Sequence, residues 1–173
     1  MIYLDYQATT PMAPEVAAAM RPWVEDKFAN PHSPSTWGRE AAAAVEMARD
    51  RLLTAVGLEE GRLAFTSGAT EAINWAVKGT LERSERRRIV TIATEHAAVL
   101  DSCAWLEGQG VQVVRLPVGA DGLVELEIAR EAIDERTALV AAMLVNNEIG
   151  VIQPVAQLAA MAHAVGAVML CDA

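Results

Sequence analysis

Residues 66–70, with the sequence TSGAT, have the composition of a phosphate-binding turn. They lie between an apolar run and a helical pattern, and the first N–H groups of a helix lack intrahelical acceptors and carry partial positive charge. Gly68 and Ala69 would let a ligand approach the backbone, and the hydroxyls of Ser67 and Thr70 could add hydrogen bonds. The segment has neither the dinucleotide-binding glycine spacing nor the lysine of the phosphate loop, so both of those motifs are disfavoured.

The same turn is also typical of an ordinary helix cap. The apolar run at residues 63–65 predicts a short strand, after which Ser67 or Gly68 would cap the helix with Glu71 in its first turn. A third reading is that the turn binds some other phosphorylated ligand. The polar residues elsewhere in the chain have to decide among these three.

Two further polar sites follow apolar runs that read as strands. His96 comes after the run at residues 89–93, and Asn146 and Asn147 come after residues 139–145. A histidine at such a junction is often structural, and an asparagine pair can simply form turn hydrogen bonds to the backbone. Each site alone therefore admits both a structural and a ligand-binding interpretation.

Asp172 is harder to explain as a purely structural residue. It ends the apolar run at residues 168–172, and an isolated charge at the end of a buried strand is costly unless it finds a partner. A helix N–H group or an arginine would suffice. A protonated ring nitrogen of a cofactor would serve equally well.

Taken together, the four sites fit pyridoxal 5′-phosphate (PLP). Its phosphate needs a helix N-terminus, its ring a stacking partner, its phenolic oxygen a donor such as an amide, and its pyridine nitrogen a carboxylate. Unit charges about 4 Å apart interact by about 4 kcal/mol at an effective dielectric constant of about 20, which would keep the ring nitrogen protonated. We expect PLP as the cofactor and no metal site.

The order of the elements predicts an α/β fold in which these sites meet. Short apolar runs alternate with amphipathic stretches, which is typical of a three-layer fold: a mostly parallel sheet with helices on both faces. Ligands bind such sheets beyond the carboxyl ends of the strands. The expected strands are residues 89–93, 111–116, 139–145 and 168–172, and the expected helices between them are residues 97–109, 126–133 and 155–164.

The N-terminal part is expected to contain an arm and two helices. Residues 1–6 alternate like a short strand, and residues 1–13 are expected to form an arm that packs with a further small domain. Helical spacing predicts helices at residues 14–29 and 36–56. Residues 14–173 are then expected to form part of a PLP-binding large domain. Because no helix follows the last strand, the sequence is expected to be a fragment or one half of a split protein.

Composition excludes several classes of partner. The 173 residues are 53% hydrophobic with a net charge of −9, which argues against nucleic acid or an anionic membrane as a partner. The one basic run, residues 86–88, is expected to be a solvated loop. Cys103 and Cys171 suit reduced thiols rather than a disulfide framework, and no secretory leader is visible. We therefore expect a cytoplasmic protein.

In order and spacing, the motifs resemble those of the cysteine desulfurases of the NifS/IscS type, which belong to the class V aminotransferase group with the PLP-dependent transferase fold type I. The resemblance covers essentially the whole chain. It implies an incomplete large domain of that fold, and a parent protein that takes sulfur from L-cysteine, leaves L-alanine and supplies iron–sulfur cluster or thio-cofactor assembly. The motifs are YLDYQATTP at residues 3–11, NP at 30–31, FTSGATE at 65–71, TEH at 94–96, VNNEIG at 145–150 and CDA at 171–173.

The resemblance also implies a role for each site residue. Ala69 and Thr70 would hold the cofactor phosphate, His96 would stack on the ring and take part in proton transfer, Asn147 would bond the phenolic oxygen, and Asp172 would pair with the ring nitrogen. The implied partners are L-cysteine and a sulfur-acceptor or scaffold protein. The implied full-length form is a homodimer with its active site at the subunit interface.

Three residues that the resemblance implies have no counterpart in this sequence. These are the Schiff-base lysine, in its Ser-x-His-Lys context, a glutamine near the cofactor, and the cysteine that accepts sulfur as a persulfide. Lys27 and Lys78 lie inside helix patterns, and Cys103 and Cys171 do not occupy the nucleophile's place. We therefore expect the 173-residue piece alone to be inactive. The alternatives are a non-catalytic fragment or half of a split protein, and another class V enzyme such as a selenocysteine lyase.

Overall fold

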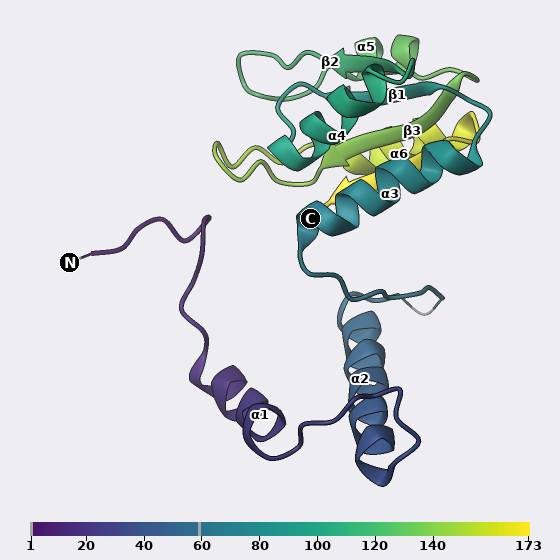
Figure 1. Cartoon of the computed structure of the whole chain (residues 1–173). Coiled ribbons are helices and arrows are strands. Elements are labelled where there is room, and N and C mark those ends of the chain that lie inside the picture. The colour runs from purple at the N-terminus through teal and green to yellow at the C-terminus, as the bar shows by residue number, and fades with distance from the viewer. Residues whose placement is uncertain (1, 59) are drawn as a thin grey trace. The chain divides into compact units, whose positions relative to one another are not determined.

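A computed structural model describes residues 2–58 and 60–173 (Figure 1). These residues divide into two compact units, Met1–Phe65 and Thr66–Ala173. Every residue proposed above for the cofactor lies in the second unit. No helix in the described ranges combines the length and apolar character that a membrane span requires. The expected arm at residues 1–13 and its packing against a further domain stay predictions.

The first unit contains two helices, α1 (Pro14–Glu25) and α2 (Thr36–Ala55). Pro14 opens α1, where its missing N–H group costs no hydrogen bond. Ser35 caps α2 by accepting a hydrogen bond from the Gly38 N–H group at 3.1 Å. Gly57, at a φ of 70°, ends α2 in the left-handed conformation that glycine tolerates. Both predicted helices are thus confirmed, and α1 ends a few residues earlier than expected.

Neither strand expected in this unit is formed. Residues 2–5 and 63–65 have no ladder partner among the described residues and run as irregular chain. At residues 63–65 a side chain takes the place of a neighbouring strand. The Arg49 guanidinium donates to the Leu63 carbonyl oxygen and lies 5.2 Å from the centre of the Phe65 ring. A short apolar run forms a strand only where another strand lies beside it, which the run itself cannot reveal.

The second unit, all of whose residues are described, is built on a sheet of four parallel strands in the order β2-β1-β3-β4 (Figure 1). The predicted parallel sheet is confirmed, because each of the four expected strands forms within two residues of its predicted ends. The strands are β1 (Arg88–Ile92), β2 (Gln112–Leu116), β3 (Thr137–Met143) and β4 (Val168–Asp172), and the helices are α3 (Ala69–Arg83), α4 (Ala97–Glu107), α5 (Leu126–Ala132) and α6 (Val155–Ala164).

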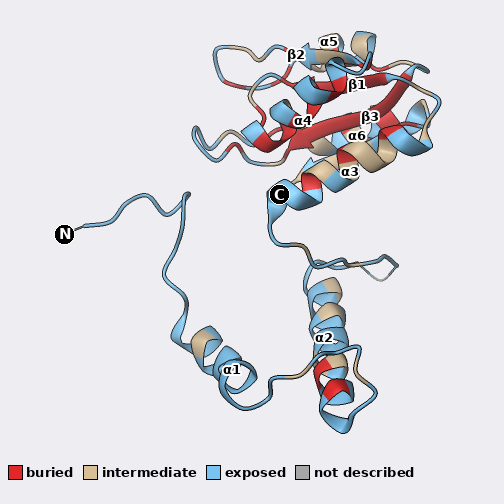
Figure 2. Cartoon of the chain, viewed as in Figure 1, coloured by how far each residue is buried: buried red, intermediate tan, exposed pale blue. Residues whose placement is uncertain are grey.

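Helices cover both faces of this sheet, as predicted. Successive residues of a strand point to opposite faces, so Leu139 of β3 packs in a core with α3 and α4 while Val140 packs in a second core with α5 and α6. All seven residues of β3 are buried, and this central strand is red along its length in Figure 2. The strand at the centre of the sheet therefore supports both layers of helices.

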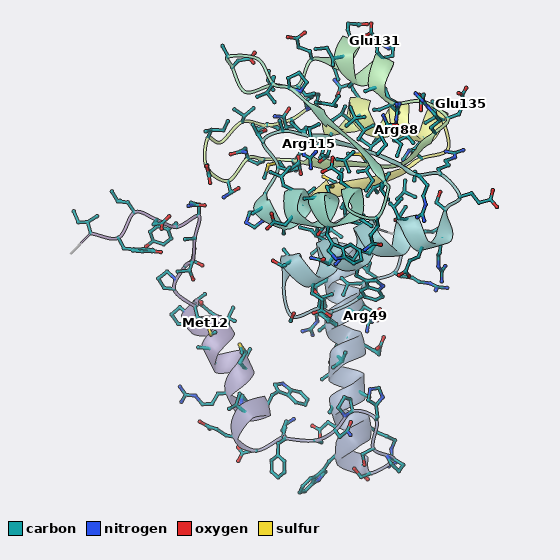
Figure 3. All side chains as sticks on the ribbon, turned by 45° about the horizontal axis from the view of Figure 1, so that its top comes forward. Met12, Arg49, Arg88, Arg115, Glu131 and Glu135 are labelled. Carbon is teal, nitrogen blue, oxygen red and sulfur yellow. The ribbon has the colours of Figure 1, made fainter. Side chains whose placement is uncertain are left out.

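The basic run at residues 86–88 is not the solvated loop that the sequence suggested. Arg86 donates to the carbonyl oxygens of Thr137 and Val165 at 3.1 and 2.8 Å. Arg88 is buried as the first residue of β1 and pairs with the Asp134 carboxylate at 2.9 Å (Figure 3). Arg87 alone is exposed. A guanidinium can cover a buried strand end because its five donors satisfy backbone carbonyls that would otherwise lack partners.

Candidate functional site

The N-terminus of α3 is open to a ligand. Gly68 is its N-cap residue in an extended conformation, with a φ of 164°, and no side chain within the unit caps the helix. A Cβ atom placed on Gly68 would have open space around it. A groove along the exposed side of α3 begins at Ser67, Thr70 and Glu71. The first-turn N–H groups therefore present a positive, accessible surface of the kind that binds an anion.

Glu71 and Ser67 hold this turn in place. The Glu71 carboxylate accepts hydrogen bonds from the Ser67 backbone N–H group at 2.7 Å and from the Ser67 hydroxyl at 2.6 Å. These bonds, the hydroxyl first, lower the pKa of Glu71 below its usual value. Gly68 is thus the N-cap residue and Glu71 lies in the first turn, as the helix-cap interpretation expected, but neither Ser67 nor Glu71 caps the helix, and the Ser67 hydroxyl is already engaged. Thr70 is exposed in the first turn of α3, as an anion-binding residue would need to be.

His96 has a structural role and is also exposed. It is the N-cap residue of α4, and its Nδ1 atom accepts a hydrogen bond from the Ala98 N–H group at 3.1 Å. A ring nitrogen that accepts a hydrogen bond carries no proton, so neutral His96 holds its proton at Nε2. The cap fixes the orientation of the ring, and the residue as a whole is exposed.

The two asparagines after β3 differ in environment. Asn146 is buried, its Oδ1 accepts from the N–H groups of Glu148 and Ile149 at 2.9 and 3.0 Å, and its Nδ2 donates to the Thr94 carbonyl oxygen at 2.8 Å. Asn147, the next residue, is exposed. The turn interpretation therefore holds for Asn146, whereas Asn147 is open to solvent.

Asp172 ends β4 beside the end of β3. Its backbone carbonyl oxygen accepts from the Leu144 N–H group at 2.7 Å, and in the ladder it lies opposite Met143. The residue is half-buried. The sheet thus fixes the backbone that carries this carboxylate, which gives it a defined position at the strand end.

Glu95 is a further residue of this region that the sequence reasoning did not single out. It is only 6% exposed, and its Oε1 atom accepts a hydrogen bond from the Met143 N–H group at 2.8 Å. Burial, with a smaller contribution from the charge of Asp172, raises the pKa of Glu95 to about 7. The argument applied to Asp172, that a carboxylate at the end of a buried strand needs a partner, applied equally to Glu95.

These residues gather at one edge of the sheet. Parallel strands end on the same side, so the segments after β1, β3 and β4 bring His96, Asn147 and Asp172 to that edge. Helix α3 begins there as well: Leu170 of β4 packs on the core that contains Ile73, one turn after Thr70. Strand β4 contacts α3, and in Figure 1 the C-terminus of the chain is drawn near the start of that helix. The edge therefore combines a helix N-terminus, an imidazole, an amide and a carboxylate.

Comparison with known families shows to which family the chain belongs. The family model of the class V aminotransferases matches residues 2–173. The chain belongs to this family. The α/β sheet with helices on both faces and the positions of the motifs agree with that membership, and the expected family resemblance is confirmed.

Curated relatives of this class V chain carry the name cysteine desulfurase IscS. One from Rickettsia akari (strain Hartford) is 45% identical over 168 residues, which cover 95% of this chain and 41% of the relative. One from Rickettsia bellii (strain OSU 85-389) is 48% identical over 160 residues, which cover 91% of this chain and 39% of the relative. The chain thus spans about two fifths of the length of these relatives.

Solved structures of similar proteins have the same fold. A NifS-like protein, 35% identical, matches 99% of this chain and 48% of its own with a TM-score of 0.95. A structure described as SspA in complex with cysteine, 34% identical, matches the whole of this chain and 50% of its own with a TM-score of 0.92. The second of these shows a protein of this fold together with cysteine.

Proposed function

We propose that this class V aminotransferase chain forms the PLP site of a cysteine desulfurase. The observation that carries the proposal is that α3, whose N-terminus at Gly68 has no side-chain cap, contacts β4, the strand that ends at Asp172. The chemistry of this set fits PLP, since one end attracts an anion and the other attracts the protonated nitrogen of a ring. The open space around Gly68 leaves room for a phosphate against the backbone.

The residues that would hold the cofactor are those expected from the sequence. Ala69 and Thr70, at the start of α3, would bind the phosphate, and Asp172 would pair with the ring nitrogen. Asn147 would bond the phenolic oxygen, and His96 would lie against the ring. When bound, PLP supplies an electron sink that weakens the bonds to the α-carbon of an amino acid.

The chain's own residues contribute electrostatics and proton transfer. A carboxylate at Asp172 favours the positive form of a ring nitrogen beside it. His96, held by its Nδ1 cap, would exchange a proton through Nε2 with a substrate at this edge. The backbone of α3 offsets the phosphate charge without any lysine in the turn.

The proposed reaction converts L-cysteine to L-alanine. The carbon–sulfur bond breaks, the sulfur joins an enzyme cysteine thiol as a persulfide, and the thiol proton replaces sulfur on the carbon, so that no external oxidant or reductant is needed. The names of the relatives and the cysteine complex of the similar structure support this assignment. We assign the accepting thiol to neither Cys103, which is buried, nor Cys171 of β4. The same proposal includes the partners and setting of the full-length protein. These are a sulfur-acceptor or scaffold protein, a role in iron–sulfur cluster or thio-cofactor assembly, a homodimer and a cytoplasmic location.

The test is an assay of L-alanine and sulfide released from L-cysteine by the protein purified from its source organism. With a thiol reductant present, which reduces the persulfide and releases its outer sulfur as sulfide, equal amounts of the two products are expected. Selenocysteine, supplied as the competing substrate, distinguishes a selenocysteine lyase. Transfer of the amino group to an oxo acid without release of sulfur would contradict the proposal.

A further inference from the structure

Glu95 fills a gap where one strand of the sheet ends before its neighbour. The ladder between β1 and β3 runs as far as the pair Thr91 and Ala141, whereas β3 continues to Met143. The Met143 N–H group donates to Oε1 of Glu95 at 2.8 Å. A carboxyl side chain thus satisfies a backbone donor that β1 no longer reaches.

The second oxygen of Glu95 has no such role. Oε2 is buried and has no hydrogen-bond partner among the described residues. Met143, which holds Oε1, lies opposite Asp172 in the ladder between β3 and β4. One carboxyl group is therefore enclosed next to the strand end that carries another. A buried charge with an unpartnered oxygen is unfavourable, and a proton on that oxygen removes the charge.

The ionisable groups around Glu95 do not offset a negative charge there. Burial, and to a smaller extent the charge of Asp172 on β4, raises the pKa of Glu95. Burial also raises the pKa of Cys171 on β4 and of Cys103 on α4, with a smaller contribution from the charge of Glu95. His96, the next residue, turns its Nδ1 toward the α4 backbone. Burial and the neighbouring charge of Asp172 therefore favour the protonated form of Glu95, which is about half populated at pH 7.

We infer that Glu95 is a positioning residue that stores a proton beside Asp172 and releases it to solvent when a cationic ring nitrogen binds there. The inference rests on the proposed function, because PLP would supply the cation. A positive ring at Asp172 would offset the repulsion on Glu95 and favour its ionised form. Because Glu95 is already almost completely buried, the ring would add little desolvation to oppose this effect.

Linkage makes the coupling reciprocal. If ring binding releases a proton from Glu95, then loss of that proton strengthens ring binding by the same factor. If the Glu95 carboxyl group only accepted the Met143 N–H hydrogen bond, its ionisation would not be coupled to ring binding. Glutamine at this position keeps an oxygen for the Met143 N–H group and an N–H donor in place of the acid proton, yet it cannot ionise. Glu95→Gln therefore separates the two roles.

The experiment is a calorimetric titration of the 173-residue protein with pyridoxamine 5′-phosphate, which carries the same ring and phosphate and needs no lysine. Titrations at pH 7 in two buffers of different ionisation enthalpy give the number of protons released per ring bound. The wild type should release up to about half a proton more than Glu95→Gln, because a group at its pKa is half protonated. Glu131→Gln, the same change at an exposed position of α5, should match the wild type (Figure 3).

The outcomes separate this inference from the proposed function. Equal proton release by the wild type and Glu95→Gln, with intact binding, would overturn the role of Glu95 and leave the cofactor site standing. Absence of pyridoxamine 5′-phosphate binding to the wild type would reject the proposed site, and the inference with it. A pH-dependent affinity that rises toward pH 8 in the wild type and is flat in Glu95→Gln would confirm the coupling.

Discussion

Asn146 joins the loop after β3 to the loop after β1, because its Nδ2 atom donates to the Thr94 carbonyl oxygen at 2.8 Å. One of these loops leads to His96 and the other carries Asn147. A single buried amide therefore sets the spacing between two of the proposed ligand-binding residues.

Replacing Asn146 with alanine should destabilise the fold by about 3 kcal/mol. The substitution removes the bond to Thr94 and leaves the N–H groups of Glu148 and Ile149 without their acceptor at a buried position. Asn147→Ala, at the neighbouring exposed position, should cost less than about 1 kcal/mol. Urea denaturation of both variants measures the difference. Similar losses of stability would show that Asn146 does not have this bridging role.

The stability of the protein should depend on pH through Glu95. Its pKa is raised from 4.5 to about 7 in the folded state, so the folded chain binds this proton more tightly than the unfolded chain. The free energy of unfolding therefore falls as pH rises from about 4.5 to 7 and levels off above that. The change is about 3 kcal/mol, at about 1.4 kcal/mol per pKa unit.

Glu95→Gln isolates this contribution, since glutamine does not titrate. Thermal unfolding of the wild type and of the variant between pH 4.5 and 8 should give curves that diverge as pH rises, with the variant more stable at pH 8. Parallel curves would mean that the Glu95 carboxyl group ionises normally in the folded protein.

Gly68→Val should separate anion binding from folding. Gly68 has an extended backbone that any residue can adopt, and there is open space where a side chain would lie. The free energy of unfolding should therefore fall by no more than about 1 kcal/mol. The valine side chain would stand where a phosphate approaches α3, and the affinity for inorganic phosphate should fall at least about tenfold. Gly68→Ser serves as the control with a smaller side chain. Unchanged phosphate affinity in the valine variant would place the anion elsewhere.

The sheet was predictable because its signal is local and strong. Each strand is a short apolar run and each connecting helix an amphipathic one, and the predicted bounds of α6, residues 155–164, are those observed. His96, Asn147 and Asp172 follow strands directly, so parallel topology alone brings them to one edge. The family resemblance then implied a role for each of them, which stays a prediction.

The misread segments depend on contacts that the sequence does not encode locally. Residues 63–65 look like a strand, but no strand lies beside them and Arg49 takes that place. Arg88 looks solvated, but Asp134, distant in sequence, lies against it. Glu95 was expected only as part of the motif at residues 94–96, and it is buried where its Oε1 accepts from the Met143 N–H group. In each case a partner far along the chain determines the environment.

Asp172 provides the most direct test of the central claim, that this sheet edge binds PLP by its ring as well as its phosphate. The measurement is the affinity of the 173-residue protein for pyridoxamine 5′-phosphate and for inorganic phosphate, with and without the substitution Asp172→Ala. We predict that Asp172→Ala lowers the affinity for pyridoxamine 5′-phosphate by about tenfold to a hundredfold, as expected for a charged hydrogen bond of about 1.5–3 kcal/mol. The affinity for inorganic phosphate should not change. Equal affinity of both proteins for pyridoxamine 5′-phosphate would contradict the account and leave only a phosphate site at α3.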